Sequence, residues 1–157
     1  MIRKSSLVFI AFLAAACSGS RPEHLGGPAE SLTPCPESPN CVSSLSTSEQ
    51  HSINAFQFEG DAKTALTKLQ GIITAAPKAQ IIFLGDHYLY AEFTSDLMGY
   101  VDDVEFLITP AHAAEGSFEQ DKTLEIHVKS ASRLGKSDFG ANRERIESIR
   151  AQFNKTQ

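Results

Sequence analysis

The sequence has no tryptophan and few methionines and tyrosines, whereas it has ten phenylalanines, so phenylalanine must supply most of the aromatic core. Positive charge is also scarce, with 14 Lys and Arg against 19 Asp and Glu and a formal net charge of -5. A surface that binds nucleic acid needs clustered basic groups that displace counterions from the phosphates. The composition therefore argues against a nucleic-acid partner.

Long hydrophobic runs are absent as well, and the apolar stretch at residues 7–13 is too short to span a bilayer as a helix. Arg3 and Lys4 precede this stretch, and three alanines lead from it to Cys17. This is the layout of an export signal, which we place at residues 1–16. Its removal takes away both basic residues and moves the formal charge from -5 to -7.

The end of the signal, Leu13-Ala14-Ala15-Ala16-Cys17, resembles a bacterial lipobox, in which the cysteine becomes the lipidated N-terminus. Ser18 resembles the choice found in lipoproteins sorted to the outer membrane. We therefore expect a lipid-anchored protein at the outer membrane, facing the periplasm. Residues 17–33, rich in Ser, Gly and Pro, are expected to form a flexible tether, and residues 34–157 one globular domain. The alternative is an ordinary cleaved signal followed by a coincidental cysteine.

Cysteine is rare, and the two that remain, Cys35 and Cys41, form an even pair in an oxidising compartment. A disulfide is the simplest assignment, with free thiols or a metal site as alternatives. Two thiolates without a nearby His or third Cys make a poor zinc site. The sequence also has no P-loop and no Gly-x-Ser-x-Gly motif, so we expect no metal, no cofactor and no hydrolase.

Apolar periodicity predicts five strands and two helices in the order β-α-β-β-β-β-α. Asp61 is placed to cap the first helix, and Pro77 ends it. The expected strands cover residues 51–58, 80–84, 87–94, 101–108 and 123–129, and the expected helices cover residues 62–76 and 141–153. Residues 111–121 are expected to form an exposed loop. The pattern predicts an α+β fold, an antiparallel sheet of about five strands with both helices packed on one face.

Polar side chains are concentrated between the last strand and the last helix. Asp138 can cap that helix, and Asp102 should face the helices and form an ion pair with Arg133 or Arg143, with a role as a catalytic acid as the alternative. The candidate polar site comprises Asn40, Asp102, Ser130, Ser132, Arg133, Asp138, Asn142 and Arg143. It could bind an anion, because arginines, hydroxyls and a helix N-terminus all donate hydrogen bonds. It could instead be a polar staple that fixes the last helix on the sheet, which is favoured because the capping Asp repels a second negative group.

The strand residues of opposite parity point away from the helices, and this second face is expected to be polar and open to water. Its members include a candidate docking face of Tyr88, Tyr90, Glu92, Glu105 and His127. Aromatic residues on an open face favour partner docking. Metal binding or acid-base chemistry at His127 is the alternative.

Four motifs occur in order along the chain: CPESPNCVSS, YLYAEF, YVDDVEF and IHVKSASRLGKSDFGANRERIESIR. Together they closely resemble the Domain of Unknown Function 1499 family, and the resemblance covers residues 34–153. Lys129 stands where many relatives have Arg, and Lys136-Ser137 where Tyr-Ser is common. The resemblance implies an exported or membrane-associated protein and carries no established activity.

Two functions are therefore carried forward. The first is a noncatalytic, membrane-anchored envelope domain that binds an envelope protein or a small ligand. The second is an enzyme of unassigned reaction, with its site where the Cys35–Cys41 loop, Asp102 and residues 130–143 meet. A concave pocket with convergent polar groups would favour the enzyme, whereas a docking module can be flat.

Overall fold

The computed structural model describes residues 19–96, 98–110 and 123–155. The predicted signal peptide, Cys17 and the loop predicted for residues 111–121 lie outside the described residues. The elements in chain order are β1 (Cys41–Ser43), β2 (Phe56–Glu59), α1 (Ala62–Ala75), β3 (Ala79–Leu84), β4 (Tyr88–Thr94), β5 (Val101–Pro110), β6 (Thr123–Ser132) and α2 (Ala141–Lys155).

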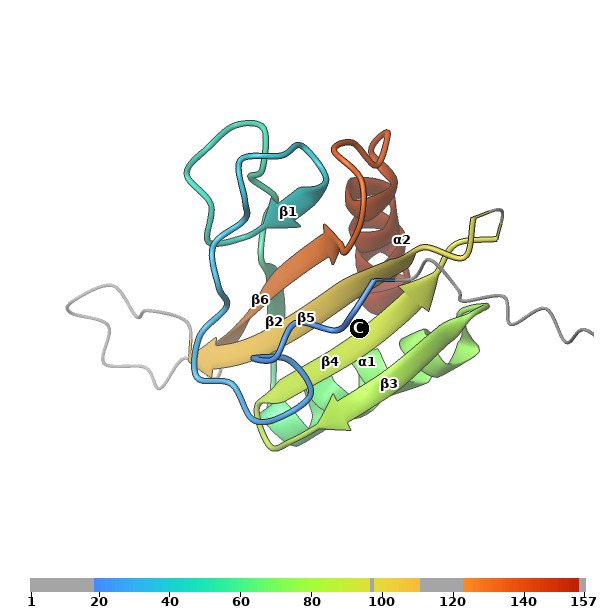
Figure 1. Ribbon diagram of the computed structural model, residues 1–157. Helices are drawn as coiled ribbons and strands as arrows, with labels where there is room; N and C mark the ends of the chain where they lie inside the picture. The colour runs from blue at the N-terminus through green and yellow to red at the C-terminus, as the bar shows by residue number, and fades with distance from the viewer. Residues whose placement is uncertain (1–18, 97, 111–122, 156–157) are drawn as a thin grey trace, which may run out of the picture.

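The strands form one six-stranded antiparallel sheet in the order β1-β6-β5-β4-β3, and β2 also pairs with β6. Both helices pack on one face of this sheet (Figure 1). The predicted α+β class and the placement of the helices are confirmed. The prediction missed β1 and began β2 five residues too early.

Both helices begin where capping side chains are available. Asp61 caps α1 by accepting a hydrogen bond from the Thr64 N–H at 2.8 Å, and α1 stops just before Pro77. Asp138 accepts hydrogen bonds from the backbone N–H groups of Gly140 and Asn142 at the start of α2. The apolar stripe of each helix then faces the sheet.

Phenylalanine fills the core between sheet and helices, as the absence of tryptophan predicted. Phe56 and Phe106 from the sheet and Phe153 from α2 are almost fully buried. The Phe56 ring lies 5.9 Å from the Phe106 ring and 5.6 Å from the Phe153 ring, centroid to centroid. Aromatic pairs at this separation add to the stabilisation from burial.

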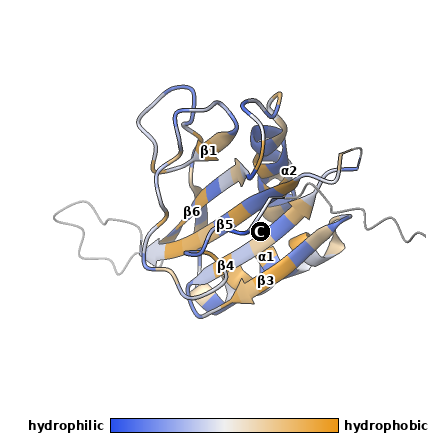
Figure 2. Cartoon of the chain, in the orientation of Figure 1, coloured by the Kyte–Doolittle hydropathy of each residue, from blue (hydrophilic) through white to orange (hydrophobic). Residues whose placement is uncertain are grey.

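Hydrophobic and hydrophilic residues follow one another along β5, as the bands of colour in Figure 2 show. Successive side chains of a strand point to opposite faces. On β5, Asp102, Val104 and Phe106 lie on the helix side, while Asp103 and Glu105 lie on the other. This alternation decides which polar residues of the sheet can meet.

Residues 19–33 lie along the second face of the sheet, so the described part of the tether predicted for residues 17–33 is packed on the domain. Leu32 is buried among Tyr88, Tyr90 and Leu107, and Leu25 and Ala29 pack against the same cluster. Arg21 forms an ion pair with Glu92 at 2.7 Å. We call residues 19–33 the covering segment (blue in Figure 1).

Candidate functional site

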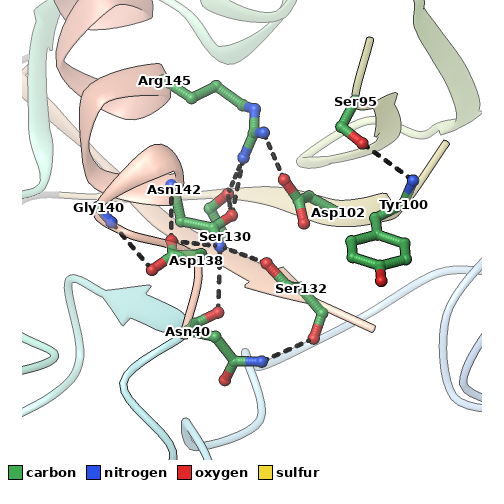
Figure 3. A network of polar contacts seen from close by, with 10 residues as sticks. All are labelled: Asn40, Ser95, Tyr100, Asp102, Ser130, Ser132, Asp138, Gly140, Asn142 and Arg145. Atoms are coloured by element: carbon green, nitrogen blue, oxygen red, sulfur yellow. Dashed lines mark hydrogen bonds and ion pairs between the residues drawn. The ribbon is translucent and has the colours of Figure 1, made fainter. Parts of the chain in front are cut away.

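Asn142, fully buried at the start of α2, is the centre of the polar cluster on the helix side of the sheet (Figure 3). Its amide nitrogen donates to the Asn40 carbonyl at 3.1 Å, to Ser132 Oγ at 2.9 Å and to Asp138 Oδ2 at 2.9 Å. Its amide oxygen accepts from Ser130 Oγ at 2.5 Å. One side chain thus joins α2 to β6 and to the disulfide loop.

The disulfide predicted from the cysteine count is present and holds this loop in place. Cys35 and Cys41 are bonded, with a Cα–Cα distance of 5.7 Å. Asn40 directly precedes Cys41, and its side-chain amide donates to the Ser132 and Gly135 carbonyls. The disulfide loop is therefore fastened to the end of β6.

Asp102 faces the helices and forms an ion pair, as predicted, but its partner is Arg145. Arg145 also donates to Asn142 Oδ1 at 2.7 Å and stacks over the Phe93 ring. The predicted partners are elsewhere: Arg143 donates to the backbone carbonyls of Gln50 and Ser52, and Arg133 lies on the other face. Arg133 follows Ser132, which faces Asp102, so strand alternation turns Arg133 away.

Asp138 caps α2 and also accepts from the Asn142 amide. Burial opposes its ionisation, but the hydrogen bonds from the Asn142 and Gly140 backbone outweigh this effect and lower the pKa of the Asp138 carboxyl. An ionised carboxylate therefore occupies the N-terminus of the helix. This geometry supports the polar staple over the anion site, because the donors are already taken.

Across the described residues, no buried side-chain nitrogen or oxygen lacks a hydrogen-bond partner. The members of the polar cluster satisfy one another's hydrogen bonds; they are Asn40, Asp102, Ser130, Ser132, Asp138, Asn142 and Arg145. Through these contacts the cluster joins α2 to β5, β6 and the disulfide loop. The arrangement consequently supports a structural role for this cluster.

The predicted docking face does point away from the helices, but it is buried under the covering segment. Tyr88, Tyr90 and Glu105 are 3%, 0% and 3% exposed, so they cannot receive a partner on this surface. Glu92 and His127 are only partly exposed. The predicted open face is wrong, because residues 19–33, predicted to be a tether, cover it.

Arg133 organises the charges beneath the covering segment. Its guanidinium contacts both carboxylate oxygens of Asp103, at 2.6 and 3.0 Å, and also contacts Glu92. It donates to the Tyr90 hydroxyl at 3.0 Å, which donates to Asp103 at 2.5 Å. A bidentate Arg–carboxylate pair of this kind is strong and directional.

A second group of charges lies further along the same face. Tyr88 donates to Glu105 at 2.8 Å, and Lys129 lies 3.8 Å from Glu105 and donates to Thr33. Burial raises the pKa of Tyr88 and of Tyr90, with Glu105 and Asp103 adding to the effect, and burial lowers the pKa of Lys129. Both tyrosines are therefore held as neutral donors.

His127 lies near the edge of this face. Its Nδ1 is 3.3 Å from Ser44 Oγ, and its Nε2 is 3.7 Å from Glu125 Oε2. Ser44 Oγ also accepts from the Val128 N–H at 2.9 Å, so the serine extends the ladder of β6. Among the described residues, no group of three or more His, Cys, Asp or Glu side chains is placed to hold a metal ion.

A groove that sequence analysis did not foresee opens beside the disulfide loop, with a volume of about 530 Å³. One wall is formed by residues 32–37, and the other by Ser43 at the end of β1 and by residues between 45 and 51. The lining residues are Leu32, Thr33, Pro34, Cys35, Pro36, Glu37, Ser43, Leu45, Ser46, Thr47, Ser48, Gln50 and His51. No periodic signal marks these residues, because the groove joins two loops.

Fixed contacts hold the walls of the groove. His51 donates from Nδ1 to the Cys41 carbonyl at 2.9 Å, and the Gln50 amide lies 3.3 Å from His51 Nε2 and 3.4 Å from the Glu37 carbonyl. Arg143 fastens the backbone of Gln50 and Ser52 to α2. Leu45 remains 49% exposed. The groove is thus a preformed surface with apolar, hydroxyl and amide groups.

Within the described part of the chain, no helix has the length and apolar character needed to cross a membrane. A search of curated proteins found no match to this sequence. The sequence model of the family described as "Protein of unknown function (DUF1499)" matches residues 31–153, which is more than half of the chain. The chain belongs to the DUF1499 family.

Proposed function

We propose that the protein is a noncatalytic binding domain of the bacterial cell envelope, anchored by lipid at Cys17 to the outer membrane and facing the periplasm. The groove beside the disulfide loop supports the binding role, because its volume of about 530 Å³ lies within the range of small-molecule sites. Its ligand is a small molecule or a short segment of an envelope protein.

The lining of the groove indicates the chemistry of this ligand. Leu45 and two prolines provide apolar contact, while serines, Thr47 and Gln50 provide hydrogen bonds. Glu37 contributes a carboxylate, and no Lys or Arg occurs among the lining residues that the structure describes. Such a surface suits a neutral or cationic ligand with one apolar side and disfavours an anion.

The enzyme alternative placed a site where the disulfide loop, Asp102 and residues 130–143 meet. These groups do meet, through Asn40 and Asn142, but their hydrogen bonds are made to one another. The closed polar cluster accordingly favours a binding role over catalysis.

The binding role is tested by thermal shift, since a ligand that binds only the folded state raises the melting temperature. Envelope extracts and a set of neutral and cationic small molecules are screened against the soluble domain. A hit should stabilise the native sequence, lose at least tenfold in affinity with Thr47→Trp, and be unchanged with Ser148→Trp on the exposed side of α2. A screen without hits, or a hit that Thr47→Trp leaves intact, contradicts the proposal.

The lipid anchor is tested separately by cell fractionation. The native protein should sediment with membranes, whereas Cys17→Ser should be released to the soluble fraction, because the acyl chains provide the attachment. Ser18→Ala, which keeps the cysteine, serves as the control and should remain with membranes. Membrane retention of Cys17→Ser after detergent-free washing would overturn the anchor.

A further inference from the structure

Exposed apolar side chains occur in two turns at one end of the sheet. Phe139, between β6 and α2, is 96% exposed, and Met98, between β4 and β5, is 58% exposed. The strand register places the two turns at the same end, because Thr94 pairs with Val101 and Asp102 pairs with Ser132. Figure 1 shows β4 and β6 ending there and β5 beginning there.

The covering segment starts at this same end. Gly19 lies so close to the turn after β6 that a Cβ atom added to it would be 3.2 Å from Arg133 Cβ and 3.3 Å from the Leu134 side chain. Only Ser18 separates Gly19 from Cys17. Two residues of extended chain reach about 7 Å. A lipid on Cys17 therefore brings the bilayer to this end of the sheet, because the chain between them is too short to hold the domain away from the membrane.

The backbone conformation of Phe139 is unfavourable, and no burial of its side chain offsets this cost. Its φ of 54° lies in the left-handed region, which is unfavourable for a bulky residue, and nearby Gly135 and Gly140 adopt positive φ without that cost. The Phe139 ring is also exposed to water. A binding partner outside the chain that covers the ring would explain both the backbone strain and the exposure of this aromatic residue.

We propose that this end of the sheet, marked by Met98 and Phe139, rests on the bilayer, with the Phe139 and Met98 side chains inserted at the boundary between headgroups and acyl chains. The inference rests on the proposed lipid anchor and adds a fixed orientation to it. Apolar residues beside a lipid anchor supply a second attachment, and aromatic rings are favoured at this boundary. The domain then lies on the membrane with this end down.

The absence of tryptophan makes the orientation directly measurable. Single-tryptophan variants Phe139→Trp and Met98→Trp are prepared as the full lipidated protein in phosphatidylethanolamine–phosphatidylglycerol vesicles that contain brominated phosphatidylcholine. Leu84→Trp is the matched control, because Leu84 is also exposed, at 40%, and pairs with Leu89 at the opposite end of β4. Fluorescence at positions 139 and 98 should be quenched several-fold more than at position 84, with a shift to shorter wavelength.

Other results separate this inference from the anchor. Equal quenching at positions 139, 98 and 84 in vesicle-bound protein overturns the orientation and leaves the anchor standing. Protein that does not float with vesicles overturns both. In the absence of vesicles, the fluorescence could shift to shorter wavelength as the protein concentration increases. Such a shift means that a second copy covers this end of the sheet, and it also overturns the proposal. Because quenching is measured at both positions 139 and 98, local misfolding of one variant cannot by itself produce the expected result.

Discussion

At the scale of the residue, Asn142 shows why an amide is needed where three segments meet. Its nitrogen donates to the Asn40 carbonyl and to Ser132, and its oxygen accepts from Ser130 and Arg145. A carboxylate has the same shape but cannot donate. Asn142 therefore both donates and accepts hydrogen bonds, which an acidic side chain cannot do at neutral pH.

Asn142→Asp should lower the free energy of unfolding by roughly 2–4 kcal/mol, because it leaves buried acceptors unpaired and adds a charge beside Asp138. Urea unfolding followed by circular dichroism measures this loss. Asn154→Asp makes the same chemical change at an exposed position of α2 and should cost less than about 1 kcal/mol. If both variants unfold at the same urea concentration, Asn142 does not staple the helix to the sheet.

The sequence predicted the sheet face on which a charged side chain lies better than it predicted that side chain's ion-pair partner. Alternation correctly placed Asp102 toward the helices, and the same rule applied to Ser132 and Arg133 would have excluded Arg133 as its partner. Arg145 could have been found from helix periodicity, since it follows Asn142 by three residues and shares its face. The strand register, which the sequence does not provide, was the missing information.

At the scale of the element, long periodic segments were predictable and short ones were not. Both helices and the strands β3 to β6 were located because each has several turns or alternations and clear boundaries such as Asp61 and Pro77. The three residues of β1 are too few to show a period. They form a strand because they pair with the end of β6, which runs to Ser132.

Residues 51–55, predicted to begin the first strand, instead contact β1, the groove and α2: His51 lines the groove, and the carbonyls of Ser52, Asn54 and Ala55 accept hydrogen bonds from α2. The His51 carbonyl accepts from the Ser43 N–H, and Arg150 of α2 donates to the carbonyls of Asn54 and Ala55. These contacts draw the backbone away from β6 until Phe56. Side chains distant in sequence thus decide the boundary, and local propensity could not reveal it.

At the scale of the whole molecule, the covering segment changes the meaning of one sheet face. Its Ser, Gly and Pro content is typical of a flexible linker, yet Leu25, Ala29 and Leu32 pack it against the sheet. Their partners, among them Tyr90 and Leu107, lie far along the chain. Burial beneath this segment turns a face of acids, bases and tyrosines into an interior layer.

Removal of residues 17–31 should therefore destabilise the domain and release its tyrosines. Burial raises the pKa of Tyr88 and Tyr90 above the ordinary value of 10.0, so folding favours their protonated forms. The associated stability is fully present below pH 10 and is lost as the pH rises above it. Thermal unfolding between pH 8 and 11, with tyrosinate absorbance recorded alongside, compares the truncated chain with Cys17→Ser.

The truncated chain should melt several degrees lower at pH 8 and should form tyrosinate at a lower pH than Cys17→Ser, because water reaches Tyr90 once Leu32 has lost its neighbours. Arg21→Gln separates the ion pair from the cover. Arg21 is 41% exposed, so losing its contact with Glu92 should change the melting temperature little. Identical melting and identical tyrosinate curves for the truncated chain and Cys17→Ser would show that the segment does not seal this face.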